Sequence, residues 1–302
     1  MSGYYDSYQF EGFRIPLDKN FVMAIPDLLE IPHVQLDHTS QIIYYNVLIH
    51  GFLLDPEYQS EKDVIVRHLY RICMALMEGW LGEIKNTPAD LIVAFFMVSM
   101  HVFWSPVWET KLTSIYQVSI TLDGCNSELS WKFLGHACAI SRALGYFTID
   151  ANQAEGKENE KEKGKQGEKE PTEHEAEIDK NRIRFEFWHL LRTDCLFRLS
   201  FGKPALIPRD SWKVNFPDPT ITGVDNASTR FIQIHFLASM RLTLIMLKYL
   251  DMEDADAEHE LDTVVYDTQV DGLIEEVQLI MSDWNAVSLN PSLDKSEKIL
   301  TQ

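Results

Sequence analysis

Apolar residues recur along most of this chain at intervals of three and four, the spacing that lines up side chains on one face of an α-helix. The pattern is clear in residues 41–48 and 64–76, and again in residues 183–195 and 230–250. Residues 91–104 are apolar almost all round, which predicts a helix enclosed by other helices. No stretch shows the two-residue alternation of a strand. The sequence therefore predicts an all-α fold, a compact multi-helix array with no significant sheet.

Glycines mark where two of these helices end. The apolar face that runs from Phe133 to Leu144 is followed by Gly145, which can adopt the positive φ of a helix C-terminus. Asn126 precedes the same face and is a good N-cap. Gly202, followed two residues later by a proline, ends the helix that contains residues 183–195.

Three segments depart from the helical pattern. Residues 1–40 are rich in aromatics and prolines and predict an extended N-terminal arm with a short helical piece, followed by one helical domain over residues 41–302. Residues 151–180 hold ten acidic and six basic residues and only one large aliphatic residue, which predicts a disordered charged insertion. Residues 251–262 hold seven acids and predict a solvated loop.

The net charge of −19, from 46 acidic and 27 basic residues, limits the partners of the chain. Neutralisation of phosphates by lysine and arginine is the main source of affinity for DNA, so direct contact with nucleic acid is disfavoured. The longest apolar run, residues 91–104, is too short to cross a bilayer, and we expect no membrane partner. No secretory signal is visible near the N-terminus, so the chain is expected inside the cell.

The four cysteines form no CxxC pair and are interpreted as buried thiols in a reducing compartment, so no metal site is predicted. No glycine-rich nucleotide-binding motif or nucleophile elbow occurs, and no cofactor is expected.

A small set of residues could carry chemistry if the chain were an enzyme. They are titratable side chains within apolar helical stretches, where burial shifts a pKa: His101, His136, His189 and Asp194. A structural role is the favoured interpretation of each, with Asp194 capped by or paired with Arg184, Arg198 or Arg209. Three tryptophans could line a ligand pocket or simply pack in the core: Trp104, Trp131 and Trp188. We expect Trp131 and Trp188 to be largely buried.

Two stretches of the sequence resemble a known family. The first, Ser130–Tyr146, reads SWKFLGHACAISRALGY, and the second runs from Arg182 through Trp188 and Asp194 to the tripeptide that begins at Gly202. Residues 207–210 and 216–217 follow in the same order. Together these stretches are similar to the fungal-specific transcription factor domain, the middle homology region of zinc binuclear-cluster transcription factors. The resemblance covers roughly residues 40–250 and implies an all-α regulatory domain.

The sequence departs from that family at several positions. Cys195, Lys203 and Phe147 stand where the family has arginine, arginine and often histidine, and no six-cysteine cluster is present. The resemblance therefore implies a transcription-regulator-like protein without its own DNA-binding domain. Such a protein would act in the nucleus, or alternatively in the cytoplasm. Its partners would be other proteins, such as a DNA-binding transcription factor, or a small-molecule ligand. It would regulate a fungal metabolic or biosynthetic gene cluster, as in secondary metabolism.

Two alternatives stay open at this point. A regulatory domain of this kind could instead serve as an enzyme that acts on a natural product in a helical pocket, because fold does not determine function. The sequence could also be part of a larger factor.

Overall fold

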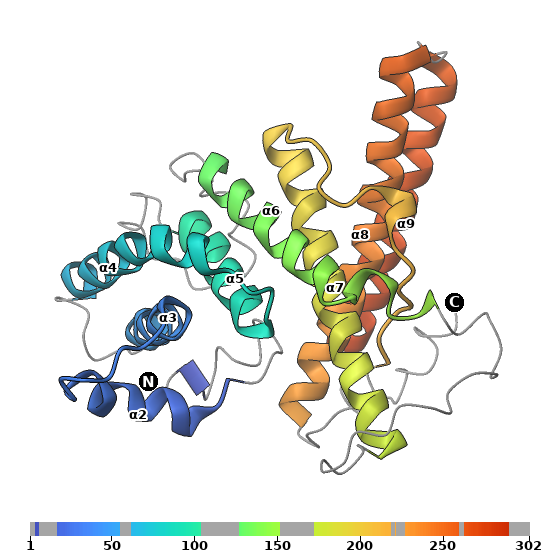
Figure 1. Ribbon diagram of the computed structural model, residues 1–302. Helices are drawn as coiled ribbons and strands as arrows, with labels where there is room; N and C mark the ends of the chain where they lie inside the picture. Colours follow the sequence, from blue (N-terminus) through green and yellow to red (C-terminus); the bar gives the residue numbers. More distant parts are fainter. Residues whose placement is uncertain are drawn as a thin grey trace, which may run out of the picture. The chain divides into compact units, whose positions relative to one another are not determined.

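The structure is a computed structural model that describes residues 4–5, 17–54, 62–103, 127–151, 172–218, 221, 227–259 and 263–289. Regular secondary structure in this part of the chain is entirely helical, which confirms the all-α prediction. The α-helices are α2 (Lys19–Leu29), α3 (His38–Leu54), α4 (Lys62–Glu83), α5 (Pro88–Phe103), α6 (Ser127–Ala143), α7 (Glu173–Phe201), α8 (Ala227–His259) and α9 (Thr263–Leu289) (Figure 1). Short 3-10 helices are η5 (Tyr146–Thr148) and η7 (Arg209–Ser211).

The sequence predicted one helical domain over residues 41–302, but the chain divides into two compact units. The first is drawn from residues 1–170, 182–187 and 209–215, and the second from the remainder. Helix α7 contributes residues to both units, which no local sequence pattern indicates.

The core of the first unit is built on α3, α5 and α6. Helix α3 packs against α2, α4 and α5, and α5 packs against α6. Every residue from Leu91 to Val98 is buried, so this segment is the enclosed helix that its composition predicted. On α6, the apolar face predicted from the sequence is buried from Phe133 to Ile140. Within the described residues, no helix combines the length and apolar character needed to cross a membrane.

The second unit contains a long helical hairpin. Helices α8 and α9 lie side by side (Figure 1) and are joined by ion pairs between their facing flanks. Lys248 Nζ lies 2.7 Å from a carboxylate oxygen of Glu276, and Arg241 Nη1 lies 3.8 Å from Asp283. These contacts set the register of the two helices.

Both predicted glycine helix ends are present. Gly145 has φ 79° and follows α6, and Gly202 has φ 59° and follows α7. The Gly202 amide donates to the carbonyl of Arg198, which satisfies a carbonyl that the helix itself leaves free. Asn126 lies outside the described residues.

The N-terminal arm predicted over residues 1–40 contains a helix, as expected for a short part of it. Residues 19–29 form α2, whose first turn is capped by the Asp18 carboxylate accepting hydrogen bonds from the amides of Asn20 and Phe21. Val22 and Ile25 are buried on its inner face, and this burial favours the helix over an extended chain.

The predicted charged insertion is shorter at its C-terminal end than residues 151–180. Helix α7 begins at Glu173, and a reciprocal capping box joins Thr172 to Glu175. Two acidic residues in the first turn also suit the helix dipole, so residues 173–180 are helical despite their polarity. Residues 152–171 lie outside the described part of the chain.

The predicted acidic loop at residues 251–262 is also helical over most of its length, because α8 continues to His259. Its acids are held by neighbours within the second unit: Arg198 donates to Asp254 at 3.0 Å, and the Tyr266 hydroxyl donates to Glu253.

A buried histidine in the first unit makes stability depend on pH. His50 donates a hydrogen bond to the Asn46 carbonyl at 2.8 Å and lies 5.2 Å from the Phe96 ring, centroid to centroid. Burial lowers the pKa of His50 to about 4, against a small opposing effect of the hydrogen bond to Asn46. The unfolded chain therefore binds a proton between pH 6.5 and pH 4 that the folded chain excludes.

We expect the free energy of unfolding to fall as pH is lowered through this window, by about 2–3 kcal/mol from this histidine alone. Urea denaturation at pH 7 and pH 4 measures the loss, and a His50→Leu variant supplies the control. The variant should lose less stability than the wild type over the same interval. Equal losses in the two proteins would contradict the assignment.

Candidate functional site

The carboxylate of Asp194 organises the chain that follows α7. Asp194 is 1% exposed, and its two oxygens accept hydrogen bonds from the amides of Leu206 and Ile207, each at 3.1 Å. Two of the arginines predicted as its partners pair elsewhere, Arg184 with Asp150 and Arg198 with Asp254. The carboxylate therefore caps a backbone turn, a structural role that accounts for its burial.

His189 belongs to a polar cluster that links α7 to α8. Arg192 donates through one terminal nitrogen to His189 Nδ1 at 3.1 Å and through the other to Ser239 Oγ at 3.0 Å. Desolvation by burial lowers the pKa of Arg192. His189 and Asp194 are five residues apart on one helix, about 140° around its axis, so the two nominated side chains point to different sides.

The other nominated histidines come from the first unit. His136 lies on α6, with its ring 6.1 Å from Trp80 in an edge-to-face arrangement. Desolvation lowers the pKa of His136, which favours a neutral imidazole. His101 lies in the last turn of α5, and its side chain is outside the described part of the chain. Among the nominated residues that the structure describes, the two α7 members are therefore not brought together.

The nominated tryptophans pack in different ways. Trp188 is 2% exposed and stacks on Phe216, with ring centroids 4.5 Å apart and planes at 15°. Trp131, which we expected to be largely buried, is only partly covered on α6, although its indole nitrogen is enclosed. Trp104 lies outside the described residues. Packing accounts for Trp188, because the indole is almost fully buried and Phe216 covers one of its faces.

The first resembling stretch and the start of the second, residues 182–187, belong to the first unit, and the rest of the second stretch belongs to the second unit. Phe147, just after α6, contacts Phe187 of α7 edge-on, with ring centroids 5.2 Å apart. Phe187 also lies 5.2 Å from Trp212, and the guanidinium of Arg142 lies 4.7 Å from the Phe147 ring centroid. Three segments that are far apart in sequence thus share one aromatic cluster.

A buried ion pair lies beside this cluster, and the sequence analysis did not identify it. Arg184 Nη2 lies 2.6 Å from Asp150 Oδ1, and Arg184 Nε also donates to the same carboxylate at 3.1 and 3.2 Å. Asp150 Oδ2 accepts the Asn215 amide at 2.7 Å, and both ionic side chains are almost fully buried. Asp150 and Arg184 are 34 residues apart, so no spacing rule predicts their pairing.

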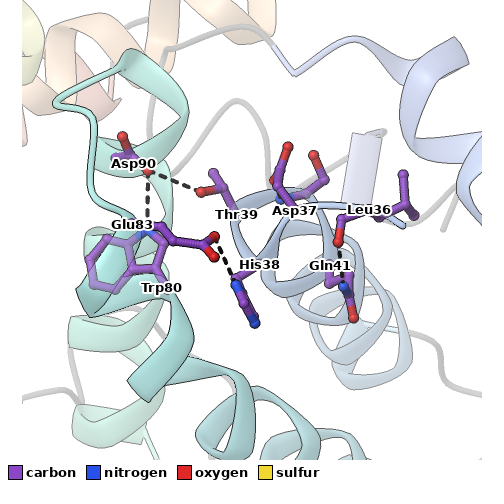
Figure 2. Close-up of polar contacts among 9 residues, drawn as sticks. Leu36, Asp37, His38, Thr39, Gln41, Trp80, Glu83 and Asp90 are labelled. Carbon is purple, nitrogen blue, oxygen red and sulfur yellow. Dashed lines mark hydrogen bonds and ion pairs between the residues drawn. The ribbon is translucent and has the colours of Figure 1, made fainter. Parts of the chain in front are cut away.

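A second buried carboxylate, Asp90, joins three helices of the first unit (Figure 2). Its oxygens accept hydrogen bonds from the Trp80 indole at 3.1 Å and the Thr39 hydroxyl at 3.0 Å, and from Thr87 through both its amide and its hydroxyl. Burial pushes the pKa of Asp90 upward, but the hydrogen bonds from these three residues outweigh it and hold the pKa below its usual value. Asp90 thus stays ionised as a structural anchor.

The sequence did contain a local signal for this anchor. Thr87, Pro88 and Asp90 occupy the N-cap, N1 and N3 positions of α5, and the Asp90 amide donates back to the Thr87 hydroxyl at 3.2 Å. Asn86 adopts a positive φ of 57° that turns the chain into this cap. Nearby, His38 donates to Glu83 at 2.9 Å (Figure 2). A side chain at Gly79 would overlap the His38 ring.

Replacing Thr87 by alanine removes the N-cap oxygen and one hydrogen bond to Asp90. We expect the free energy of unfolding to fall by about 1 kcal/mol, the usual cost of losing such a cap. Thermal unfolding followed by circular dichroism measures the change. Thr87→Ser keeps the hydroxyl and should lose much less stability, whereas equal losses would show that the methyl group matters instead.

The described residues contain no group of three or more side chains placed to bind a metal ion. Cys73, Cys138 and Cys195 are buried free thiols, as the sequence predicted. Burial raises the pKa of Cys73 and of Cys195 to about 12, which keeps both thiols protonated and poorly nucleophilic.

Comparisons of the chain with known protein families, with curated proteins and with solved structures found no match. What the chain does must therefore be argued from its own residues.

Proposed function

We propose that this chain is a transcription-regulator-like protein that acts in the nucleus through contacts with other proteins or a small molecule, and that its 302 residues do not themselves bind DNA. The partner would be a DNA-binding transcription factor that controls a fungal metabolic or biosynthetic gene cluster. The proposal starts from the resemblance of two stretches to the fungal-specific transcription factor domain.

One structural observation carries the proposal. The first resembling stretch, the start of the second stretch (residues 182–187) and residues 209–215 belong to one unit, where Asp150 pairs with Arg184. Residues that resemble a family signature are expected to build its fold, and the contacts of Arg184 and Asp194 are of this structural kind. The charge of −19 supports action through proteins rather than through DNA phosphates.

The enzyme alternative draws little support from the described residues. The oxygens of Asp194 hold backbone amides, His189 accepts from Arg192, and His136 packs on Trp80. A catalytic acid–base pair needs two such groups to converge on one substrate atom, and His189 and Asp194 point to different sides of α7.

A tethering experiment tests the proposal. The chain is fused to a heterologous DNA-binding domain and expressed in a fungal host with a reporter gene under that domain's operator. We expect reporter output to change relative to the DNA-binding domain alone, and a fluorescent fusion of the chain to accumulate in the nucleus. The purified chain should not bind duplex DNA selectively at physiological salt. An unchanged reporter, or nanomolar sequence-selective DNA binding by the chain alone, would refute the proposal.

A further inference from the structure

Helix α9 packs on α8 along a regular seam. The least exposed residues of α9 follow one another at spacings of four and three: Tyr266, Val270, Leu273, Val277 and Ile280. This is the heptad spacing of a helix that packs against one neighbour. Glu276 and Asp283, seven residues apart, flank the seam and pair with Lys248 and Arg241 of α8, which are also seven residues apart.

The opposite flank of α9 carries a second stripe with the same spacing. Its members are all exposed, and we call them the α9 stripe: Asp267, Asp271, Ile274, Gln278 and Met281. Each follows a seam residue by one position, so the stripe lies about 100° around the helix from the seam. Ile274 and Met281 are each 48% exposed, which is high for aliphatic side chains at heptad spacing.

The two acids of the stripe differ from those on the other flank. Within the described residues, Asp267 and Asp271 make no hydrogen bond or ion pair, whereas Glu276 and Asp283 each face a cation of α8. Helix α9 also carries five acids and neither lysine nor arginine. Apolar positions that extend beyond one seam are typical of a helix that has two helical neighbours. Among the described elements, α8 alone makes extensive contact with α9, and it packs along the seam.

We propose that the α9 stripe binds an amphipathic helix of a partner protein, with lysine or arginine opposite Asp267 and Asp271 and aliphatic residues opposite Ile274 and Met281. The basic residues of such a helix would pair with the acids of the α9 stripe, as Lys248 and Arg241 of α8 pair with Glu276 and Asp283 on the other flank of α9. A second copy of this chain fits poorly, because its own α9 would bring like charges to the stripe. The inference rests on the proposed function, since it names the chemistry of the protein partner.

A designed peptide of about three heptads provides the probe. It carries leucine at its apolar positions and lysine at the two positions, four residues apart, that face Asp267 and Asp271. A matched peptide carries glutamate in place of these lysines. Binding of each labelled peptide to the full chain is measured by fluorescence anisotropy at physiological salt, where unspecific attraction between exposed charges is screened.

We expect the lysine peptide to bind and the glutamate peptide to bind at least tenfold more weakly. The charge-reversed variant Asp267→Lys/Asp271→Lys should lose at least about tenfold in affinity for the lysine peptide and gain affinity for the glutamate peptide. The control Asp27→Lys/Glu30→Lys reverses two exposed acids of the first unit, with the same change in net charge, and should bind like the wild type. Ile274→Ser/Met281→Ser should weaken binding of both peptides. Circular dichroism verifies that each variant keeps its helix content.

The site is refuted if the wild type binds neither peptide, or if the stripe variant and the control variant weaken binding equally, which would indicate bulk charge alone. These failures are distinguishable from failure of the proposed function. A tethered chain that changes the reporter without binding the peptide leaves the function standing and removes the site. If the chain binds the peptide but leaves the reporter unchanged, the site stands and the proposed function is refuted.

Discussion

Replacing Arg184 by alanine is expected to lower the free energy of unfolding by about 3–5 kcal/mol, because it leaves the Asp150 carboxylate buried without its guanidinium. The side chains of both residues are at most 6% exposed, so water cannot take over the lost hydrogen bonds. Urea denaturation followed by circular dichroism measures the loss. The same change should weaken the attachment of Asn215, whose amide donates to Asp150.

Two further variants separate charge from geometry at this site. Arg184→Lys keeps the charge but loses the forked contact of Nε and Nη2, and should recover only part of the stability. The double variant Arg184→Met/Asp150→Leu removes both charges and should be more stable than Arg184→Ala. If it is less stable than the single variant, the unpaired carboxylate is not the cause of the loss.

Replacing Trp188 by alanine is expected to cost about 3–5 kcal/mol, the range found for removal of a large buried aromatic side chain. The indole is 2% exposed and stacks flat on Phe216, so the variant leaves a cavity and frees one face of the Phe216 ring. Thermal and urea denaturation of the purified variant measure the effect.

Matched variants test the role of the stack. Phe216 is 46% exposed, so Phe216→Ala should cost clearly less than Trp188→Ala. Trp188→Phe keeps a ring in the stack and should fall between the wild type and Trp188→Ala. If Phe216→Ala costs as much as Trp188→Ala, the stacked contact rather than burial of the indole determines the loss. Trp131 is only partly covered, and its replacement should cost less than that of Trp188.

These residues bear on how the family resemblance is understood. Trp188, Arg184 and Asp194 lie within one resembling stretch, and each has a described structural partner: Phe216, Asp150 and two backbone amides. These contacts show that the three residues support the fold of this chain. Specific function would then reside in exposed surfaces such as the α9 stripe.

The sequence alone determined the features that depend on neighbours within one or two helical turns. The apolar face of α6, the enclosed character of α5 and the positive φ of Gly145 and Gly202 follow from spacing and from the conformational freedom of glycine. The capping box of Thr172 and Glu175 was equally local. Polar composition predicts disorder up to residue 180, but the capping box begins a helix at Glu173 within that segment.

Only the tertiary structure decided which distant side chains meet. Asp150 and Arg184, or Asp90 and Thr39, pair because packing of separate helices brings them within hydrogen-bonding distance, and no spacing along the chain encodes that approach. Helix α8 continues through the acidic residues 251–259, where Arg198 donates to Asp254 and Tyr266 donates to Glu253. These two contacts come from other helices, so no pattern in the local sequence encodes them.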